Sequence, residues 1–167
     1  MTTLPARGVH ANKLIVGKPA PPIALHTLDG TTLALNDLRG QVVILTFWAS
    51  WCEPCQQEFP LLDHFLKQHA EQGLTILAFS LDGIDSIPDV RKTAATVDFP
   101  VGLLGSPWAG GYGRIWRLPV SFVIDRDGNL IYNGWKDKHP AWTEKSLQQV
   151  VLPLLKRSPT TPAPAQH

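Results

Sequence analysis

The sequence QVVILTFWASWCEPCQ spans residues 41–56. Residues 41–48 form an almost unbroken run of β-branched, aliphatic and aromatic residues, which is typical of a central strand covered on both faces. Both cysteines of the chain, Cys52 and Cys55, follow at once. Apolar residues then recur at helical spacing from residue 62 to residue 70, before Gly73, a residue type that often ends a helix. This stretch predicts a strand, a cysteine-containing turn and a helix in direct succession.

The spacing of the two cysteines indicates chemistry rather than a structural staple. A disulfide stabilises a fold mainly by closing a long loop of the unfolded chain, and only two residues separate this pair. A cysteine at the start of a helix lies beside unpaired backbone N–H groups and the positive end of the helix dipole, which favour its thiolate. We therefore expect Cys52 to be the attacking thiolate and Cys55, one turn further in, to be the buried resolving thiol.

The residues around Cys52 should modulate this chemistry. Glu53 places a negative charge beside the thiol and should oppose thiolate formation. Pro54 lacks an N–H group, at a helix-start position where that group is not needed. Trp51 is expected to be a partly exposed aromatic residue that shapes the approach to Cys52.

Two structural interpretations of the cysteine pair compete with redox chemistry. A Cys-x-x-Cys pair is half of a zinc site, but zinc needs four ligands, and the nearest histidines, His64 and His69, lie five residues apart on a helix that is already used for the core. The pair could also be two inert core cysteines. Because the pair lies next to a βαβ pattern, redox chemistry explains it better than either alternative. We expect no metal and no cofactor.

The rest of the chain predicts a single α/β domain. Residues 74–81 are the next apolar run, and the intervening helix implies that they pair in parallel with residues 41–48 through a right-handed crossover. Asp-Gly turns at residues 29–30 and 127–128 separate short strand-like runs and predict two hairpins. A further strand is expected at 99–104, and further helices from about 85–88 to 96 and from Thr143, with a break at Pro153. This order predicts a central mixed β-sheet flanked by helices, with an added N-terminal β-hairpin.

Composition bounds the organisation and the partners of the protein. The chain of 167 residues suits one domain, which we place at residues 15–157, between a flexible N-terminal segment at 1–14 and a disordered Pro/Thr-rich tail at 158–167. A net charge of +1 gives no reason to expect a nucleic-acid partner. The chain contains no run of 18 apolar residues, and its first sixteen residues lack the apolar stretch of a secretory signal. A cytoplasmic protein, and an extracytoplasmic one whose signal or anchor has been removed, both fit.

At this point the residues resemble a known family. Residues 47–55 resemble the thioredoxin active-site segment, and Pro60 matches the proline that kinks the thioredoxin active-site helix. More narrowly, the chain resembles the TlpA/ResA-like membrane-associated thioredoxins and redoxins, in residues 17–21, 29–30, 35–40 and 58–60. The resemblance covers about residues 17–155 and implies a thioredoxin fold. Members of this family work outside the cytoplasm, often tethered, and reduce apocytochrome c or the cysteines of copper sites.

A second landmark of the family is a cis-proline that faces the cysteines and precedes a strand. Residues 118–125 resemble this segment. The resemblance implies a cis peptide bond before Pro119, which leaves the backbone of Leu118 free to pair with an extended substrate. An ordinary trans-proline at a strand start is the alternative.

The chain departs from the family pattern at the group that deprotonates the resolving cysteine. Thioredoxins carry a buried aspartate six residues before the first cysteine, and this chain has Thr46 there, which cannot act as a carboxylate base. Deprotonation of Cys55 then requires another group or water. In ResA-like members an acidic residue after the following strand is thought to serve the site. Asp82 and Asp85 lie near that position, although a role as loop or helix-cap acids is favoured for both.

The combined prediction is a monomeric thiol–disulfide oxidoreductase that reduces protein disulfides through Cys52 and Cys55 and is recharged by a membrane or soluble thiol reductant. We expect an extracytoplasmic location, with or without a membrane anchor, and a cytoplasmic one is the alternative. Two other activities compete. A peroxiredoxin-type peroxidase shares the fold, but has a threonine where this chain has Ala49 and a different cysteine spacing. A copper(I)-binding module would use the same soft thiolates.

Overall fold

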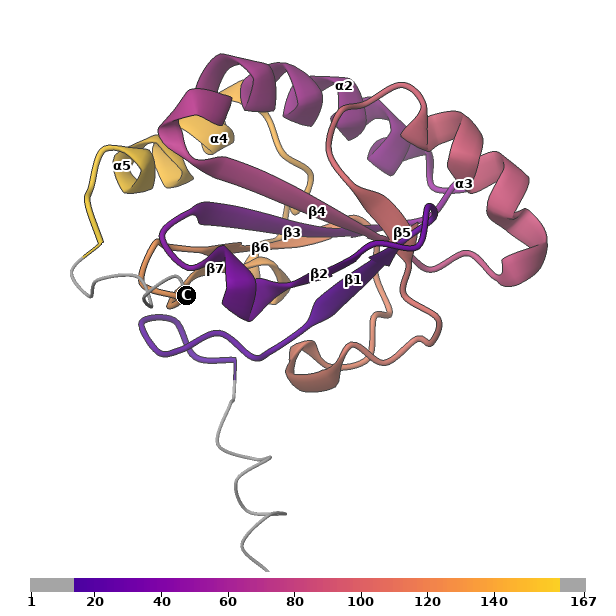
Figure 1. Ribbon diagram of the computed structural model, residues 1–167, viewed down its shortest axis with the longest axis horizontal. Helices are drawn as coiled ribbons and strands as arrows, with labels where there is room; N and C mark the ends of the chain where they lie inside the picture. The colour runs from indigo at the N-terminus through magenta and orange to yellow at the C-terminus, as the bar shows by residue number, and fades with distance from the viewer. Residues whose placement is uncertain (1–13, 160–167) are drawn as a thin grey trace, which may run out of the picture.

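The computed structural model describes residues 14–159 (Figure 1). The predicted flexible segment at residues 1–14 and the predicted tail at 158–167 lie almost wholly outside the described residues. The described chain forms a seven-stranded sheet in the order β2-β1-β5-β4-β3-β6-β7. The strands are β1 (Ala24–Thr27), β2 (Thr32–Ala34), β3 (Val42–Trp48), β4 (Leu74–Ser80), β5 (Val101–Leu103), β6 (Val120–Ile124) and β7 (Leu130–Asn133). The α-helices are α2 (Glu53–His69), α3 (Ile87–Ala94), α4 (Glu144–Val150) and α5 (Leu152–Leu155).

Strand β3 lies at the centre of the sheet. It pairs in parallel with β4, from Val42 beside Leu74 to Trp48 beside Ser80, and antiparallel with β6. All of its residues are buried, as predicted for an apolar run without alternation. Helix α2 connects β3 to β4, so the predicted βαβ unit is present (Figure 1).

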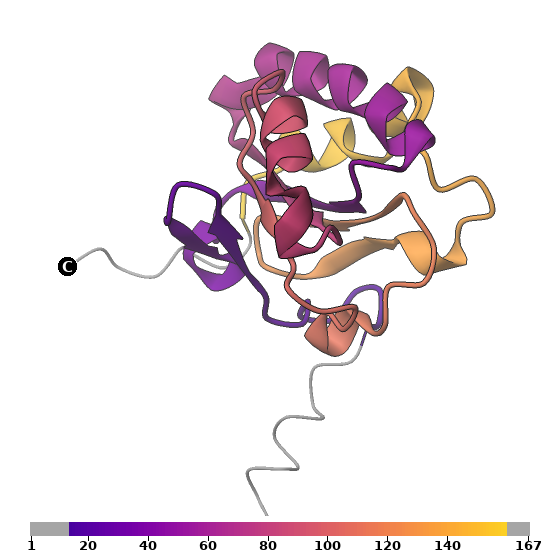
Figure 2. The ribbon, with the colours of Figure 1, turned by 90° about the vertical axis from the view of Figure 1, so that its right-hand side faces the viewer.

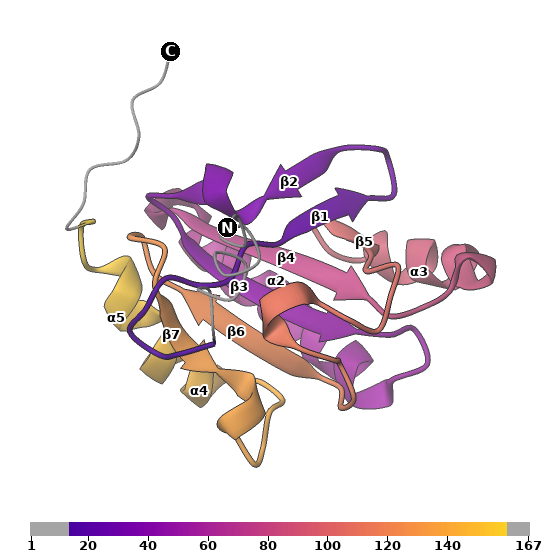
Figure 3. The same ribbon diagram turned by 90° about the horizontal axis from the view of Figure 1, so that it is seen from below.

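The two faces of the sheet are covered by different kinds of structure. The alternate apolar residues of β3 that begin with Val42 belong to a core shared with α2, α3, α4 and α5. Those that begin with Val43 belong to a second core, completed by the 3₁₀ segments Leu35–Leu38 and Gly110–Tyr112. Figure 2 shows this layering from the side, with α2 above the strands, and Figure 3 shows the face of the sheet opposite to α2. The flanking α-helices therefore cover one face of the mixed sheet.

Helix α2 begins where the cysteine pair begins. Cys52 is its N-cap residue, and Pro54 lies in the first turn, where a missing N–H group costs no hydrogen bond. The helix continues through Pro60 to His69 and is followed by a 3₁₀ turn. Gly73 then ends the segment with a φ of 86°, in the left-handed conformation that was predicted for it.

The remaining predicted elements are also present. Strands β1 and β2, and strands β6 and β7, form the two antiparallel hairpins. Thr143 caps α4 in a capping box with Ser146, and the break before α5 places Pro153 in the first turn of that helix. No helix within residues 14–159 combines the length and the apolar character needed to cross a membrane.

Candidate active site

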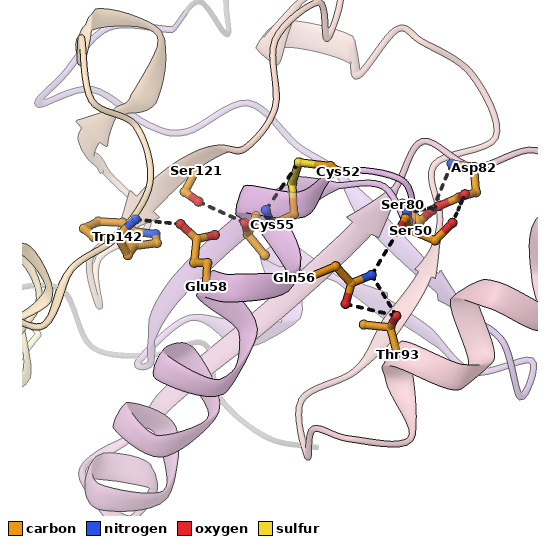
Figure 4. Close-up of a disulfide and its surroundings, with 11 residues drawn as sticks. Ser50, Cys52, Cys55, Gln56, Glu58, Ser80, Asp82, Thr93, Ser121 and Trp142 are labelled. Atoms are coloured by element: carbon orange, nitrogen blue, oxygen red, sulfur yellow. Dashed lines mark hydrogen bonds between the residues drawn. A yellow bond between two sulfur atoms is a disulfide. The ribbon is translucent and has the colours of Figure 1, made fainter.

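The two cysteines form a disulfide at the N-terminus of α2 (Figure 4). Cys52 retains 6% of its surface exposed, whereas Cys55 is completely buried. The backbone N–H of Cys55 donates a hydrogen bond to Sγ of Cys52 at 3.3 Å. The first turn of the helix thus points a backbone N–H group, one without a partner inside the helix, at Sγ of Cys52. This hydrogen bond would stabilise a thiolate on Cys52 after reduction. This geometry fits the roles predicted for the two cysteines.

An apolar hollow lies beside Cys52. The predicted site residues Trp51, Glu53, Pro54 and Leu118 all line it, together with Leu81, Ile115 and Trp116. The Leu118–Pro119 peptide bond is cis, as predicted. The backbone N–H and C=O of Leu118 have no hydrogen-bond partner within residues 14–159. The structure therefore brings the predicted site residues together and leaves unpaired backbone groups where an extended chain could add its own.

A hydrogen-bond network holds the loop that precedes Cys52. Asp82, which is 5% exposed, accepts hydrogen bonds from the backbone N–H of Ser50 at 2.8 Å and from its hydroxyl at 2.6 Å. The hydroxyl of Ser80 donates a third bond to Asp82, also at 2.6 Å. On the other side, the amide of Gln56 donates to the Ser50 carbonyl at 3.1 Å and to the hydroxyl of Thr93 at 3.0 Å (Figure 4). The loop is therefore fixed to both β4 and α3.

The structure agrees with the preferred interpretation of Asp82 as a loop acid and adds what its carboxylate binds. Asp82 is a loop acid, but the loop it holds is the one that leads into the cysteine motif, so it supports the active site directly. Asp85 differs, because it is exposed and lies in the 3₁₀ turn Ile84–Ser86.

We expect Asp82→Ala to impair both stability and thiol exchange. The variant leaves two buried or half-buried donors of Ser50 and one of Ser80 without their acceptor, which should lower the free energy of unfolding by about 2–4 kcal/mol. The loosened loop should slow reduction of a protein disulfide by roughly 10-fold. Urea unfolding and a disulfide reduction assay measure the two effects. Asp85→Ala is the matched control and should change the free energy of unfolding by less than about 0.5 kcal/mol.

Sequence reasoning missed one acidic residue at the site, Glu58. It lies three residues after Cys55 on α2 and is 3% exposed. Its Oε2 accepts a hydrogen bond from the backbone N–H of Trp142 at 2.6 Å, while Oε1 has no partner within residues 14–159 (Figure 4). Burial raises the pKa of Glu58 to about 7, although the Trp142 amide and the nearby Thr46 hydroxyl act in the opposite direction. A buried carboxyl that titrates near neutral pH is suited to accept or donate a proton.

Glu58 provides a buried carboxyl close to Thr46, the position at which this chain lacks the aspartate of thioredoxins. Thr46 is buried on β3, accepts a hydrogen bond from the Ser121 hydroxyl at 3.0 Å, and lowers the pKa of Glu58 through its own hydroxyl. The carboxyl that β3 lacks is therefore supplied to the same region by α2. The signal for it was in the sequence: Glu58 lies three residues after Cys55 and four before Leu62, on the apolar face of the helix, where an acid is unusual.

A model of the AhpC/TSA family matches residues 16–133, more than half of the chain. The chain belongs to the AhpC/TSA family. Thiol-disulfide oxidoreductase ResA of Bacillus thuringiensis (strain Al Hakam) is 35% identical over 120 residues, covering 71% of this chain and 69% of that protein. A solved protein from Chlorobium tepidum, described as thiol:disulfide interchange protein DsbE, is 30% identical, with a TM-score of 0.67 over 86% of this chain and 99% of that one. A secreted thiol-disulfide isomerase from Corynebacterium glutamicum is 26% identical, with a TM-score of 0.67 over 82% of this chain and 85% of that one.

These matches confirm the thioredoxin fold and the resemblance to TlpA/ResA-like proteins. This member of the AhpC/TSA family is a thiol–disulfide oxidoreductase of the ResA/DsbE type. Among residues 14–159 the structure contains no group of three or more His, Cys, Asp or Glu side chains that could hold a metal ion. Of the two histidines weighed as zinc ligands, His64 and His69, His69 contacts the Gln72 side chain at 2.5 Å.

Proposed function

We propose that the protein reduces disulfides in protein substrates, with Cys52 as nucleophile and Cys55 as resolving thiol. The thiolate of Cys52 attacks one sulfur of the client disulfide and displaces the other as a thiolate. Cys55, once deprotonated, attacks Sγ of Cys52 and releases the second client sulfur. Two electrons pass to the client, and the enzyme is left with the Cys52–Cys55 disulfide. An upstream thiol reductant then restores the dithiol.

The observation that carries this proposal is the position of the disulfide at the N-terminus of α2. The outer sulfur, Sγ of Cys52, accepts a hydrogen bond from a backbone N–H, and the inner sulfur, that of Cys55, is buried. Only the outer sulfur can meet a partner molecule. The unpaired backbone of Leu118 beside the same hollow supports a polypeptide as that partner.

The acids around the pair support reduction as the direction of transfer. Glu53 follows Cys52 directly, and the buried carboxyl of Glu58 lies one turn from Cys55. Negative charge near the sulfurs disfavours the thiolate and so destabilises the reduced form relative to the disulfide. A dithiol whose reduced form is less stabilised is the stronger reductant.

The reduction potential tests the direction. We expect a value close to that of thioredoxin, about −270 mV, rather than that of the oxidant DsbA, about −120 mV. Equilibration of the protein with glutathione redox buffers, followed by thiol alkylation, measures it, and insulin reduction with dithiothreitol as recharging thiol measures turnover. A potential near the DsbA value would reverse the proposed direction. Rapid turnover of hydrogen peroxide would favour a peroxidase instead, although Ala49 and the dithiol spacing argue against it.

We place the protein outside the cytoplasm in this proposal. Support comes from the similar Corynebacterium glutamicum protein, which is described as secreted. Clients in cytochrome c maturation or copper-site assembly are the ones that the TlpA/ResA resemblance suggests. Fractionation of cells that produce the protein from its own gene tests the location.

A further inference from the structure

The buried carboxyl of Glu58 meets the segment between β7 and α4, residues 134–142, which we call the strap. The last residue of the strap, Trp142, is buried and donates its backbone N–H to Oε2 of Glu58 at 2.6 Å. Figure 4 shows Trp142 on the side of Glu58 away from Ser50. The contact of this carboxyl with solvent therefore depends on where the strap lies.

Tyr132, on β7, fastens the strap at two points. Its ring packs against the ring of Trp142, with 5.0 Å between centroids. Its hydroxyl donates a hydrogen bond to Oδ2 of Asp137 at 2.5 Å. This bond holds the pKa of Asp137 below its ordinary value, so the acceptor is a carboxylate at neutral pH and the bond is charge-assisted. One side chain thus contacts both the middle and the end of the strap.

The start of the strap is held by Arg117. Its guanidinium donates hydrogen bonds to the carbonyls of Asp137 and Gly134, at 2.9 and 2.8 Å. Asp137 also accepts the backbone N–H of His139 at 2.9 Å. Two side chains from outside the strap therefore hold Asp137, and of these two Tyr132 is the one that also packs against Trp142.

Few titratable groups lie around Glu58. Cys55 precedes it by one turn on α2, β3 presents the hydroxyl of Thr46, and the strap contributes a backbone N–H. From β7 comes Tyr132, whose pKa is raised by burial, by its bond to Asp137 and by the nearby charges of Asp137 and Glu58. Among residues 14–159, no basic side chain shifts the pKa of Glu58, and its burial has the largest effect. Whatever keeps water from this carboxyl thus controls its protonation.

We propose that Tyr132 is a positioning residue for proton transfer at the dithiol. By holding the strap against Glu58, it keeps water from the carboxyl and keeps the Trp142 N–H on Oε2. Cys55 gives its proton to the Glu58 carboxylate as it attacks Sγ of Cys52, and Glu58 returns the proton when an upstream thiol reduces the disulfide. This inference rests on the proposed function, because it concerns the same reaction, and Tyr132 acts through Glu58 rather than on the sulfurs.

The test follows the carboxyl of Glu58 itself, through the ¹³C chemical shift of its side chain across pH in the oxidised protein. Glu58→Gln identifies the signal, and the wild-type protein should titrate near pH 7. Tyr132→Ala removes both the ring and the hydroxyl, so water should reach the carboxyl and lower the midpoint by about one pH unit or more. The inflection in the pH–rate profile of insulin reduction should move with it.

Two variants of Asp137 test the clamp without removing a core side chain. Asp137→Ala takes away the acceptor of the Tyr132 hydroxyl and should lower the midpoint by about 0.5 pH units. Asp137→Asn keeps an acceptor oxygen without the charge and should stay close to the wild-type midpoint. Tyr112→Phe is the matched control, because it removes a tyrosine hydroxyl that donates to the carbonyl of Pro21 in the core on the other face of the sheet. It should leave the midpoint unchanged.

Several outcomes would overturn the role of Tyr132. One is a wild-type midpoint near the ordinary value of 4.5, and another is a midpoint that neither Tyr132→Ala nor Asp137→Ala lowers. An equal shift in both Asp137 variants would assign the effect to charge, and a pH–rate profile that does not follow the titration would separate the strap from proton transfer. Because the titration needs no turnover, failure to reduce insulin would overturn the proposed function, whereas normal reduction with unshifted midpoints would overturn the positioning role alone.

Discussion

A Cys55→Ser variant should accumulate a stable mixed disulfide between Cys52 and its client. The resolving step needs a second thiolate within reach of Sγ of Cys52, and Cys55 is the one cysteine that supplies it. Its loss should stop the reaction after the first exchange and lower multiple-turnover reduction of a protein disulfide by about 10³-fold or more. Non-reducing electrophoresis and mass spectrometry of the adduct measure the trapped species.

Cys52→Ser is the matched control, since it removes the same disulfide and the same number of thiols. It should trap no client, because the remaining Cys55 is completely buried and no client sulfur can approach it. The opposite pattern, with adducts on Cys55 and none on Cys52, would contradict the assignment. Equal trapping by both variants would show that burial of Cys55 does not separate the two roles.

The parts of this fold that were predictable are those encoded in contiguous sequence. The buried strand β3, the cysteine turn and the start of α2 follow one another along the chain, so local patterns of hydrophobicity, proline and cysteine specify them. The same holds for the hairpin turns and for Gly73, whose positive φ few other residues adopt.

The parts that were missed depend on contacts between distant segments. Glu58 accepts a hydrogen bond from the backbone of Trp142, 84 residues away along the chain, and Asp82 accepts one from the backbone of Ser50, 32 residues away. The family resemblance singled out Asp82 as a candidate, but nothing near it in the sequence shows that its carboxyl will turn toward the cysteine loop. The stacking of Trp116 on Trp135 likewise joins two separate segments of the chain, so no local sequence pattern predicts it.

Replacing Glu58 with glutamine should remove a pH dependence near neutrality from the reaction. Burial raises the pKa of the carboxyl to about 7, so above that pH it is ionised, and we expect it to act as the base for Cys55, which lies one helical turn away. Glutamine keeps the shape and an acceptor for the Trp142 N–H but cannot take a proton. We expect kcat to fall by about 10²-fold above pH 7, with the inflection near pH 7 lost from the pH–rate profile. Glu71→Gln removes an equal charge at an exposed position and should keep the inflection.

The same substitution should stabilise the oxidised protein at high pH, which separates a functional role from a structural one. Glu58 keeps its proton up to a pH of about 7 in the folded state, against an ordinary value of 4.5, so the folded chain binds more protons between these values. The free energy of unfolding therefore falls as pH rises through this window, and the loss is complete above it. Glu58→Gln should abolish that fall and gain up to roughly 3 kcal/mol at pH 8 in urea unfolding. A variant that is slower yet more stable would show that the buried acid is there for proton transfer, whereas loss of both activity and stability would show that it is part of the packing.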